Sequence, residues 1–195
     1  MNHARSKDLR LPRLPASEDG SVTIEFAFVA PILVILCLGV VEATNMLSQD
    51  RTVALANETM VDYVARLKTV AATDQTTVGQ ALDLMMSPYG SSYKSSIAIA
   101  SFDANGNLNA GPSQFSVHGS GYCFTTAEIT TDACPPGSTP ACLSAGSDSM
   151  VIGKTTSLYQ PILLPTFMPH NFSLGGLNMQ RPREKQLTSS VTTCS

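Results

Sequence analysis

An uncharged run over residues 26–41 constrains this chain more than any other feature of its sequence. As a helix, the run would be roughly 24 Å long at about 1.5 Å per residue, whereas a bilayer core needs about 30 Å. It reaches that length only by including residues 22–24 and Ala43, which places Glu25 and Glu42 at its two boundaries. The run therefore has the length and composition of a membrane-spanning segment.

A cleaved signal peptide and a buried core helix are the two alternatives for such a run. A signal peptide is followed by a small-residue cleavage site and a polar mature start. Here the apolar run passes into a helical pattern without a break, so we predict a retained transmembrane helix over residues 21–45. Four basic residues precede the run, and the next basic residue is Arg51. The positive-inside rule then places residues 1–20 in the cytoplasm and the chain beyond the helix outside it.

Glu25 is unusual because an ionisable side chain at membrane depth is costly and points to a function. The simpler alternative is that it lies at the interface and reaches toward water. Cleavage after Gly20 would make Ser21 a new N-terminus and Glu25 the fifth residue of the mature chain. The new ammonium of one helix would then pair with the carboxylate of its neighbour, which relieves the cost of both charges in lipid.

These residues carry a resemblance to type IV pilin processing sites. The residues that match are Gly20, Glu25, Phe26, Ala27 and the internal Pro31. The apolar run, continued by Gly39 and Glu42, is similar more narrowly to the TadE-like family, the minor pseudopilins of tight-adherence (Flp/Tad) pilus systems. Residues 151–165 are similar to the strand-then-proline segment in the C-terminal part of that family.

The resemblance implies a role in pilus biogenesis or adherence, with no catalytic activity and no cofactor. A prepilin peptidase would cut between Gly20 and Ser21, ahead of Phe26, and Glu25 would be the assembly carboxylate. The partners implied are that peptidase, other pilins and pseudopilins, and inner-membrane lipid. The C-terminal domain would be periplasmic, and whether the protein enters the fibre or stays at its base is left open. The alternative is an uncleaved single-pass protein whose periplasmic domain binds an envelope partner or ligand.

Residues 46–72 predict a continuation of the helix outside the membrane. One apolar stripe recurs at helical spacing over Met46, Val53, Met60, Val64, Leu67 and Ala71. The polar residues, among them Gln49, Asp50, Glu58 and Asp62, fall mostly elsewhere. The protein's own sheet or a partner helix would cover the stripe. A second short helix is predicted over residues 77–86, with capping side chains in residues 74–77.

Residues 73–195 predict a single extracytoplasmic domain of α+β class. From residue 95 the apolar pattern alternates, with Ile97 and Ile99 opposite Ala98 and Ala100. Further strands are predicted over residues 115–118 and 148–159. A long helix followed by a few short strands indicates a small antiparallel sheet, pilin-like in outline. Residues 123–147 read as an irregular loop, and the Pro-rich tail 160–195 is expected to wrap the sheet or fray.

The chain has five cysteines. Cys37 lies within the apolar run and is read as a small apolar residue. The other four fall on the oxidising side of the predicted topology, which favours two disulfides with three possible connectivities. We prefer Cys134–Cys142 as a local loop and Cys123–Cys194 as a tether for the tail. A zinc site is disfavoured because no C-x-x-C pair occurs and no histidine lies close to the cluster.

Composition and motifs argue against other function classes. Twelve scattered basic residues and a net charge of −3 leave no basic patch for nucleic acid. Gly153 and the two residues after it resemble the end of a phosphate-binding loop. The position that the motif requires to be its first glycine is occupied by Asp148, so the motif is absent. His3, His118 and His170 have no evident nucleophile or carboxylate partner in the sequence. No enzyme signature remains.

Overall fold

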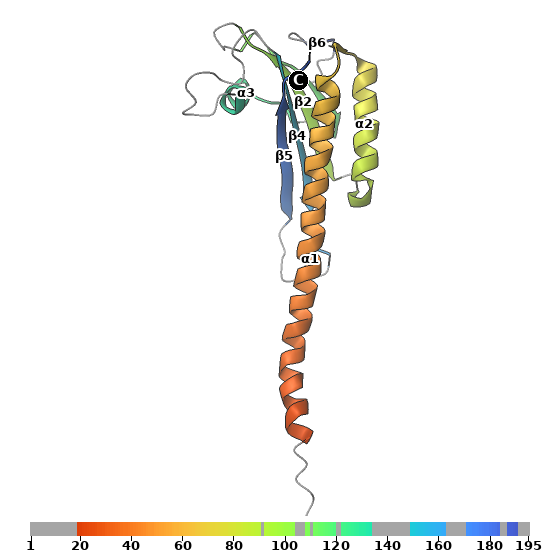
Figure 1. Cartoon of the computed structure of the whole chain (residues 1–195), viewed down its shortest axis with the longest axis vertical. Coiled ribbons are helices and arrows are strands. Elements are labelled where there is room, and N and C mark those ends of the chain that lie inside the picture. Colours follow the sequence, from red (N-terminus) through yellow and green to blue (C-terminus); the bar gives the residue numbers. More distant parts are fainter. Residues whose placement is uncertain are drawn as a thin grey trace, which may run out of the picture. The chain divides into compact units, whose positions relative to one another are not determined.

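The computed structural model describes residues 19–90, 92–103, 108–109, 111–119, 122–133, 149–162, 171–183 and 187–190. The chain forms two compact units, Met1–Val40 and Val41–Ser195. The helix α1 (Asp19–Ala65) contributes to both units (Figure 1). The predicted leader, residues 1–20, lies outside the described residues except for the helical positions 19 and 20.

The first unit contains the N-terminal part of α1, which is apolar and holds Pro31 inside the helix. Within the described residues, the segment Val22–Ala65 of α1 is long and apolar enough to cross a membrane, and its most apolar stretch is not buried against the rest of the chain. The predicted membrane-spanning helix is therefore present as one N-terminal apolar helix.

The second unit is built around a four-stranded antiparallel sheet with the order β3-β2-β4-β5. Its elements after α1 are β1 (Thr69–Val70), α2 (Ala72–Met86), η1 (Ser87–Tyr89), β2 (Tyr93–Ser101), β3 (Ser113–His118), α3 (Thr126–Ala133), β4 (Ser149–Tyr159), β5 (Phe172–Gln180) and β6 (Thr188–Ser189). Strands β1 and β6 form a separate parallel pair. The predicted α+β class with a small antiparallel sheet is confirmed.

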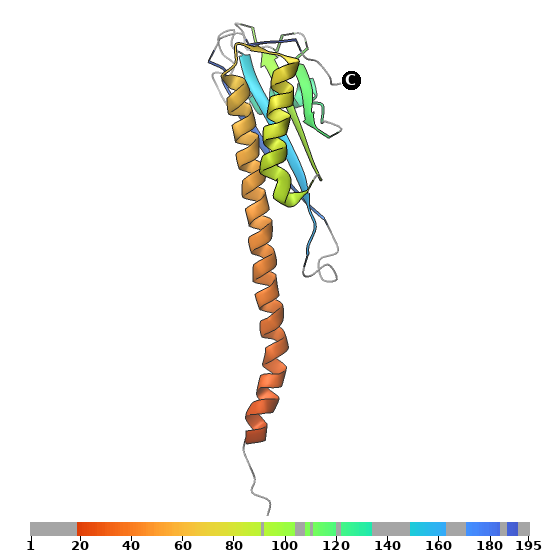
Figure 2. The same cartoon turned by 90° about the vertical axis from the view of Figure 1, so that its right-hand side faces the viewer.

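Helices cover both faces of the sheet, so the second unit has three layers. The C-terminal part of α1 and α2 lie side by side on one face, and α3 lies beyond the other (Figures 1 and 2). The predicted alternation in β2 separates the two cores: Ile97 and Ile99 pack with α1 and α2, while Ala98 and Ala100 pack with Ile129 of α3. The protein's own sheet, and not a partner helix, therefore covers the buried part of the apolar stripe of α1.

Two helix boundaries differ from the prediction. Helix α1 ends at Ala65, about two turns before residue 72, because the chain turns there so that Thr69 can pair with Thr188. Helix α2 begins at Ala72 and not at residue 77. Its start is fixed by the Asp74 carboxylate, which accepts a hydrogen bond from the backbone N–H of Ala71 at 2.9 Å.

Two elements lie where irregular chain was predicted. Helix α3 occupies part of the expected loop 123–147, and a capping box starts it: the Glu128 carboxylate accepts from the Thr125 N–H at 2.9 Å, and Thr125 Oγ1 accepts from the Glu128 N–H at 3.2 Å. Strand β5 occupies part of the expected tail and pairs with β4 along its whole length. Its glycine pair, Gly175 and Gly176, interrupts the apolar alternation that marks a strand.

Candidate functional site

The predicted processing residues lie at the beginning of α1. Gly20 and Ser21 belong to its first turn, and Glu25 and Phe26 follow one turn later. Glu25 is exposed, and Phe26 keeps 66% of its surface exposed. Among the described residues, no hydrogen bond or ion pair reaches the Glu25 carboxylate. The described part of the chain thus leaves this charge without a partner inside an apolar surface.

The helix surface around Glu25 consists of large exposed apolar side chains. The most exposed large apolar side chains of this part of α1 are Val22, Ile24, Phe26, Phe28 and Val40, each with more than 60% of its surface open. Such a continuous apolar surface is stable only against lipid or against other apolar helices. Cys37 lies on the same surface and is an exposed free cysteine.

Cys123 is disulfide-bonded. The other three predicted disulfide cysteines, Cys134, Cys142 and Cys194, lie outside the described residues. The preferred pairing therefore stays a prediction.

In the second unit, three buried polar side chains of α1 form a polar seam against β4. They are Glu42, Gln49 and Asn57, which are 3%, 5% and 1% exposed. Their spacing of seven and eight residues is close to two helical turns each, so they share one face of the helix. Their partners run backward along β4, from Tyr159 through Ser157 to Thr155 and Gly153. Helix α1 and strand β4 are therefore antiparallel, and the seam fixes their register.

Glu42 is held at the first end of the seam by two donors. Its Oε1 accepts hydrogen bonds from the Tyr159 hydroxyl at 2.5 Å and from the backbone N–H of Ile162 at 2.8 Å. Burial, and then the hydrogen bond and negative charge of Glu42, raise the pKa of Tyr159 to about 12. Tyr159 therefore keeps its proton and serves as a donor across the physiological pH range.

The middle and the far end of the seam use neutral side chains. Gln49 Nε2 donates to Ser157 Oγ at 2.8 Å. Asn57 Nδ2 donates to the carbonyl oxygens of Gly153 and Gly176, both at 3.0 Å, while its Oδ1 accepts from Thr155 Oγ1 at 3.2 Å. One asparagine thus joins α1 to two neighbouring strands, and removing its side chain would break all three of these buried hydrogen bonds.

A glycine on β4 makes the close approach at Asn57 possible. A Cβ atom at Gly153 would overlap Val61 Cγ2 and would lie 3.0 Å from Asn57 Oδ1 and 3.1 Å from Met60 Cε. Gly153 is the glycine whose surroundings suggested a phosphate loop in the sequence. Its position in the middle of β4 and beneath α1 shows that it serves packing.

Sequence reasoning missed the seam because it treated the polar residues of α1 as facing away from the core. That was wrong for Gln49, which is 5% exposed and points at β4. A signal was present: Glu42, Gln49 and Asn57 recur at two-turn spacing beside the apolar stripe. Polar residues at this spacing usually indicate a solvent-exposed helix face. Their burial becomes evident only from their hydrogen bonds to hydroxyl side chains of β4.

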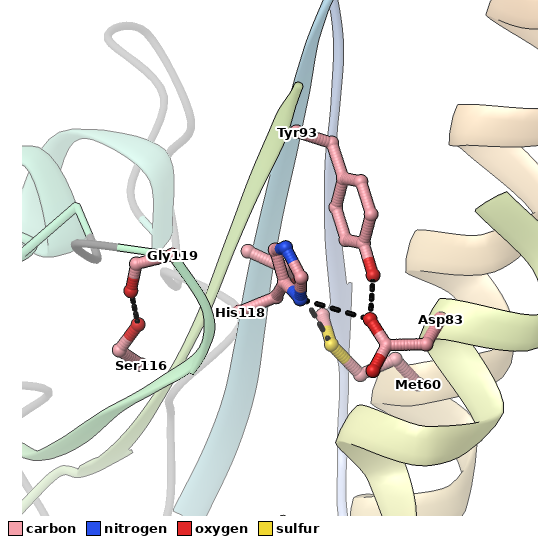
Figure 3. A network of polar contacts seen from close by, with 7 residues as sticks. Met60, Asp83, Tyr93, Ser116, His118 and Gly119 are labelled. Atoms are coloured by element: carbon pink, nitrogen blue, oxygen red, sulfur yellow. Dashed lines mark hydrogen bonds and ion pairs between the residues drawn. The ribbon is translucent and has the colours of Figure 1, made fainter. Parts of the chain in front are cut away.

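A second polar cluster joins α2 to the sheet (Figure 3). The Asp83 carboxylate of α2 accepts a hydrogen bond from the Tyr93 hydroxyl of β2 and lies 2.8 Å from Nδ1 of His118, the last residue of β3. The rings of Tyr93 and His118 are stacked with their centroids 4.0 Å apart. Burial and the contact with Asp83 raise the pKa of Tyr93 above its ordinary value. His118 therefore has a carboxylate partner, Asp83, which lies 35 positions earlier in the sequence and could not be recognised from spacing.

Both polar clusters consist of hydrogen bonds and an ion pair that join helices to the sheet. Within the described part of the chain, no group of three or more His, Cys, Asp or Glu side chains is arranged to hold a metal ion.

An N-terminal apolar helix followed by an antiparallel sheet domain defines a protein of α+β class. The family model described as TadE-like protein matches residues 20–57 of the chain, which confirms the resemblance noted in the sequence. The match begins at Gly20, includes Glu25, and ends at Asn57, the last residue of the seam. The chain therefore carries a TadE-like segment in its N-terminal helix. No curated protein and no solved structure matches the chain.

Proposed function

We propose that this protein is a minor pseudopilin that acts in the biogenesis of a Tad-type pilus. The observation that carries the proposal is the exposed Glu25 within the apolar surface of α1, five residues after the glycine at which the TadE-like match begins. A prepilin peptidase cuts after Gly20, and Ser21 becomes the mature N-terminus. The protein itself has no catalytic role.

The proposed mechanism pairs charges between neighbouring helices in the membrane. The ammonium of Ser21 on one mature subunit meets the Glu25 carboxylate of an adjacent pilin or pseudopilin. Each charge alone is costly in lipid, and pairing removes most of that cost, so only one packing register is favoured. The exposed side chains around Glu25 supply the apolar contacts between the helices.

The proposed topology places the N-terminus in the cytoplasm and the sheet domain in the periplasm of a bacterial inner membrane. Basic residues ahead of α1 and none between residues 19 and 50 support this orientation. The disulfide at Cys123 also supports it, because the periplasm is an oxidising compartment.

Mass spectrometry of the protein purified from membranes tests the cleavage. An N-terminus at Ser21 is expected; an intact Met1 start would favour the uncleaved alternative, in which the domain binds an envelope partner.

Counting pili by electron microscopy tests the charge pairing. We expect Glu25→Val to abolish piliation while cleavage continues. The matched control is Glu58→Val, which removes an exposed carboxylate of α1 outside the apolar run and should leave piliation unchanged. Normal piliation with Glu25→Val would refute the pairing.

A further inference from the structure

A pocket lies beside the polar seam, between α1, η1 and the C-terminal end of β4. Its volume is about 350 Å³, and small-molecule sites usually enclose about 300–1,000 Å³. The described residues that line it all belong to the second unit. The polar side chains among them, apart from Tyr159 of the seam, are Asn45, Ser48, Gln49, Tyr89, Ser92 and Gln160.

These six side chains are neutral hydrogen-bonding groups. Three carry carboxamides and three carry hydroxyls, and no charged residue is among the described residues of the lining. Carboxamides and hydroxyls both donate and accept hydrogen bonds, as the hydroxyl groups of a sugar do. A charged ligand would lose its hydration and find no countercharge, which is costly. The lining therefore favours an uncharged ligand with many hydroxyl or amide groups.

Gln49 provides a buried acceptor in this pocket. It is 5% exposed, and its Nε2 already donates to Ser157 Oγ at 2.8 Å. Among the described residues, none donates a hydrogen bond to its Oε1. A buried carbonyl oxygen without a donor is unfavourable, and a hydroxyl group of a ligand would satisfy it. Gln49 thus offers an acceptor that is fixed in position before a ligand arrives.

Tyr89 provides an aromatic ring that is also fixed in advance. Its hydroxyl lies 3.2 Å from Ser48 Oγ and 3.4 Å from Thr52 Oγ1, so two hydrogen bonds hold it against α1. The apolar side chains Leu158 and Ile162, 48% and 71% exposed, belong to the same lining. A sugar ring has apolar C–H faces besides its hydroxyls, and such a face packs well on an aromatic ring. The pocket therefore offers both kinds of contact that a sugar ring makes.

We propose that this pocket binds one ring of an uncharged sugar chain. An apolar face of the ring packs on Tyr89, and its hydroxyl or acetamido groups form hydrogen bonds with Asn45, Gln160 and Gln49 Oε1. Neutral rings of this kind occur in N-acetylated cell-wall glycan and in neutral polysaccharides, which share this chemistry. The inference goes beyond the proposed function, since it requires neither cleavage nor charge pairing of the N-terminal helix.

Saturation-transfer NMR of the full-length protein in lipid nanodiscs tests the proposal, with empty nanodiscs as the blank. Triacetylchitotriose represents the wall glycan and maltotriose the neutral polysaccharides, while trigalacturonic acid is the charged control. A site for a single ring predicts a dissociation constant on the order of 1 mM for at least one neutral probe. The charged trimer should bind at least about tenfold more weakly. The neutral probe that binds more tightly identifies the source of the sugar.

Two pairs of variants make the test specific for the pocket. Tyr89→Leu removes the ring and should weaken binding by about tenfold or more. Its matched control is Tyr63→Leu, at an exposed tyrosine of α1 outside the pocket, which should leave binding unchanged. Asn45→Leu should weaken binding by about fivefold through a lost hydrogen bond. Its control is Gln80→Leu, which removes an exposed carboxamide of α2 outside the pocket and should have no effect.

Three results would overturn the proposal. The first is the absence of saturation transfer to either neutral trimer at about 10 mM, well above the expected dissociation constant. The second is binding of trigalacturonic acid as tight as that of the neutral trimers. The third is binding that both pocket variants retain, or that the two control variants weaken as strongly, because the sugar would then lie elsewhere on the protein.

Discussion

Replacing Gly153 with alanine provides the sharpest test of how α1 is fastened to the sheet. The added Cβ would overlap Val61 Cγ2, and Val61 is fully buried, so the methyl groups cannot move into solvent. Overpacking of this kind typically costs about 1–3 kcal/mol. Displacement of Asn57, which lies 3.0 Å from the new atom, weakens buried hydrogen bonds worth about 1 kcal/mol each. We therefore expect Gly153→Ala to lower the free energy of unfolding by about 3 kcal/mol.

The compensating change is Val61→Ala, which removes the overlapping methyl group. Alone it should cost about 2 kcal/mol through lost burial and a small cavity. In the double variant the new methyl occupies part of that cavity, so the combined loss should fall short of the sum by at least about 1.5 kcal/mol. The matched control is Gly176→Ala, whose Cβ would lie 3.6 Å from Ala54 Cα in ordinary contact. It should change stability by less than about 0.5 kcal/mol.

Urea unfolding of the full-length protein in detergent, followed by tyrosine fluorescence, measures these differences. The chain has no tryptophan and five tyrosines, of which Tyr93 and Tyr159 are buried in the sheet domain, so the signal reports on this unit. Additive losses for Gly153→Ala and Val61→Ala would refute the reasoning, as would a Gly153→Ala protein as stable as the control. Either result would mean that α1 does not lie against β4 at this distance.

Three further predictions follow from the two polar clusters. Asn57→Ala should lower the free energy of unfolding by about 2–4 kcal/mol, because it removes three buried hydrogen bonds, two to strand carbonyls and one from Thr155 Oγ1; urea unfolding measures this. Since the pKa of Tyr159 is raised from 10.0 to about 12, its contribution to stability is complete below pH 10 and is lost between pH 10 and 12; Tyr159→Phe should flatten alkaline unfolding curves in that window. Asp83→Asn should speed hydrogen exchange in α2 while exchange in β4 stays constant, whereas equal acceleration in both would show that Asp83 supports the whole domain and not the attachment of α2.

Periodic patterns predicted the elements that bury apolar side chains at regular intervals. The uncharged run indicated the N-terminal helix, and the alternation around Ile97 and Ile99 correctly assigned the two faces of β2. These predictions succeed because a residue's face follows directly from the helical or strand period. The end of α1 at Ala65 could not be read in this way, because it depends on pairing between Thr69 and Thr188, which are far apart in the sequence.

The missed elements share a different cause. Helix α3 is short and threonine-rich, so its low intrinsic propensity hid a capping box that was visible at Thr125 and Glu128. Strand β5 has glycines at two central positions and is stabilised by β4 along its whole length. In both cases tertiary contacts supply what the local sequence lacks. The polar seam was missed for the same reason, since its partners lie about 100 residues away from α1.

The two carboxylates that border the apolar run have different roles. From the sequence, Glu25 and Glu42 look equivalent, since each limits the uncharged segment on one side. Glu42 is 3% exposed, and its own chain provides the Tyr159 hydroxyl and the Ile162 amide as donors. Glu25 is exposed and has no described partner. A charge that its own chain already satisfies gains little from a neighbour, whereas one left in an apolar surface gains a great deal. In the function proposed above, Glu25 is therefore the carboxylate that pairs with an adjacent subunit, whereas Glu42 already has its partners on β4 and at Ile162.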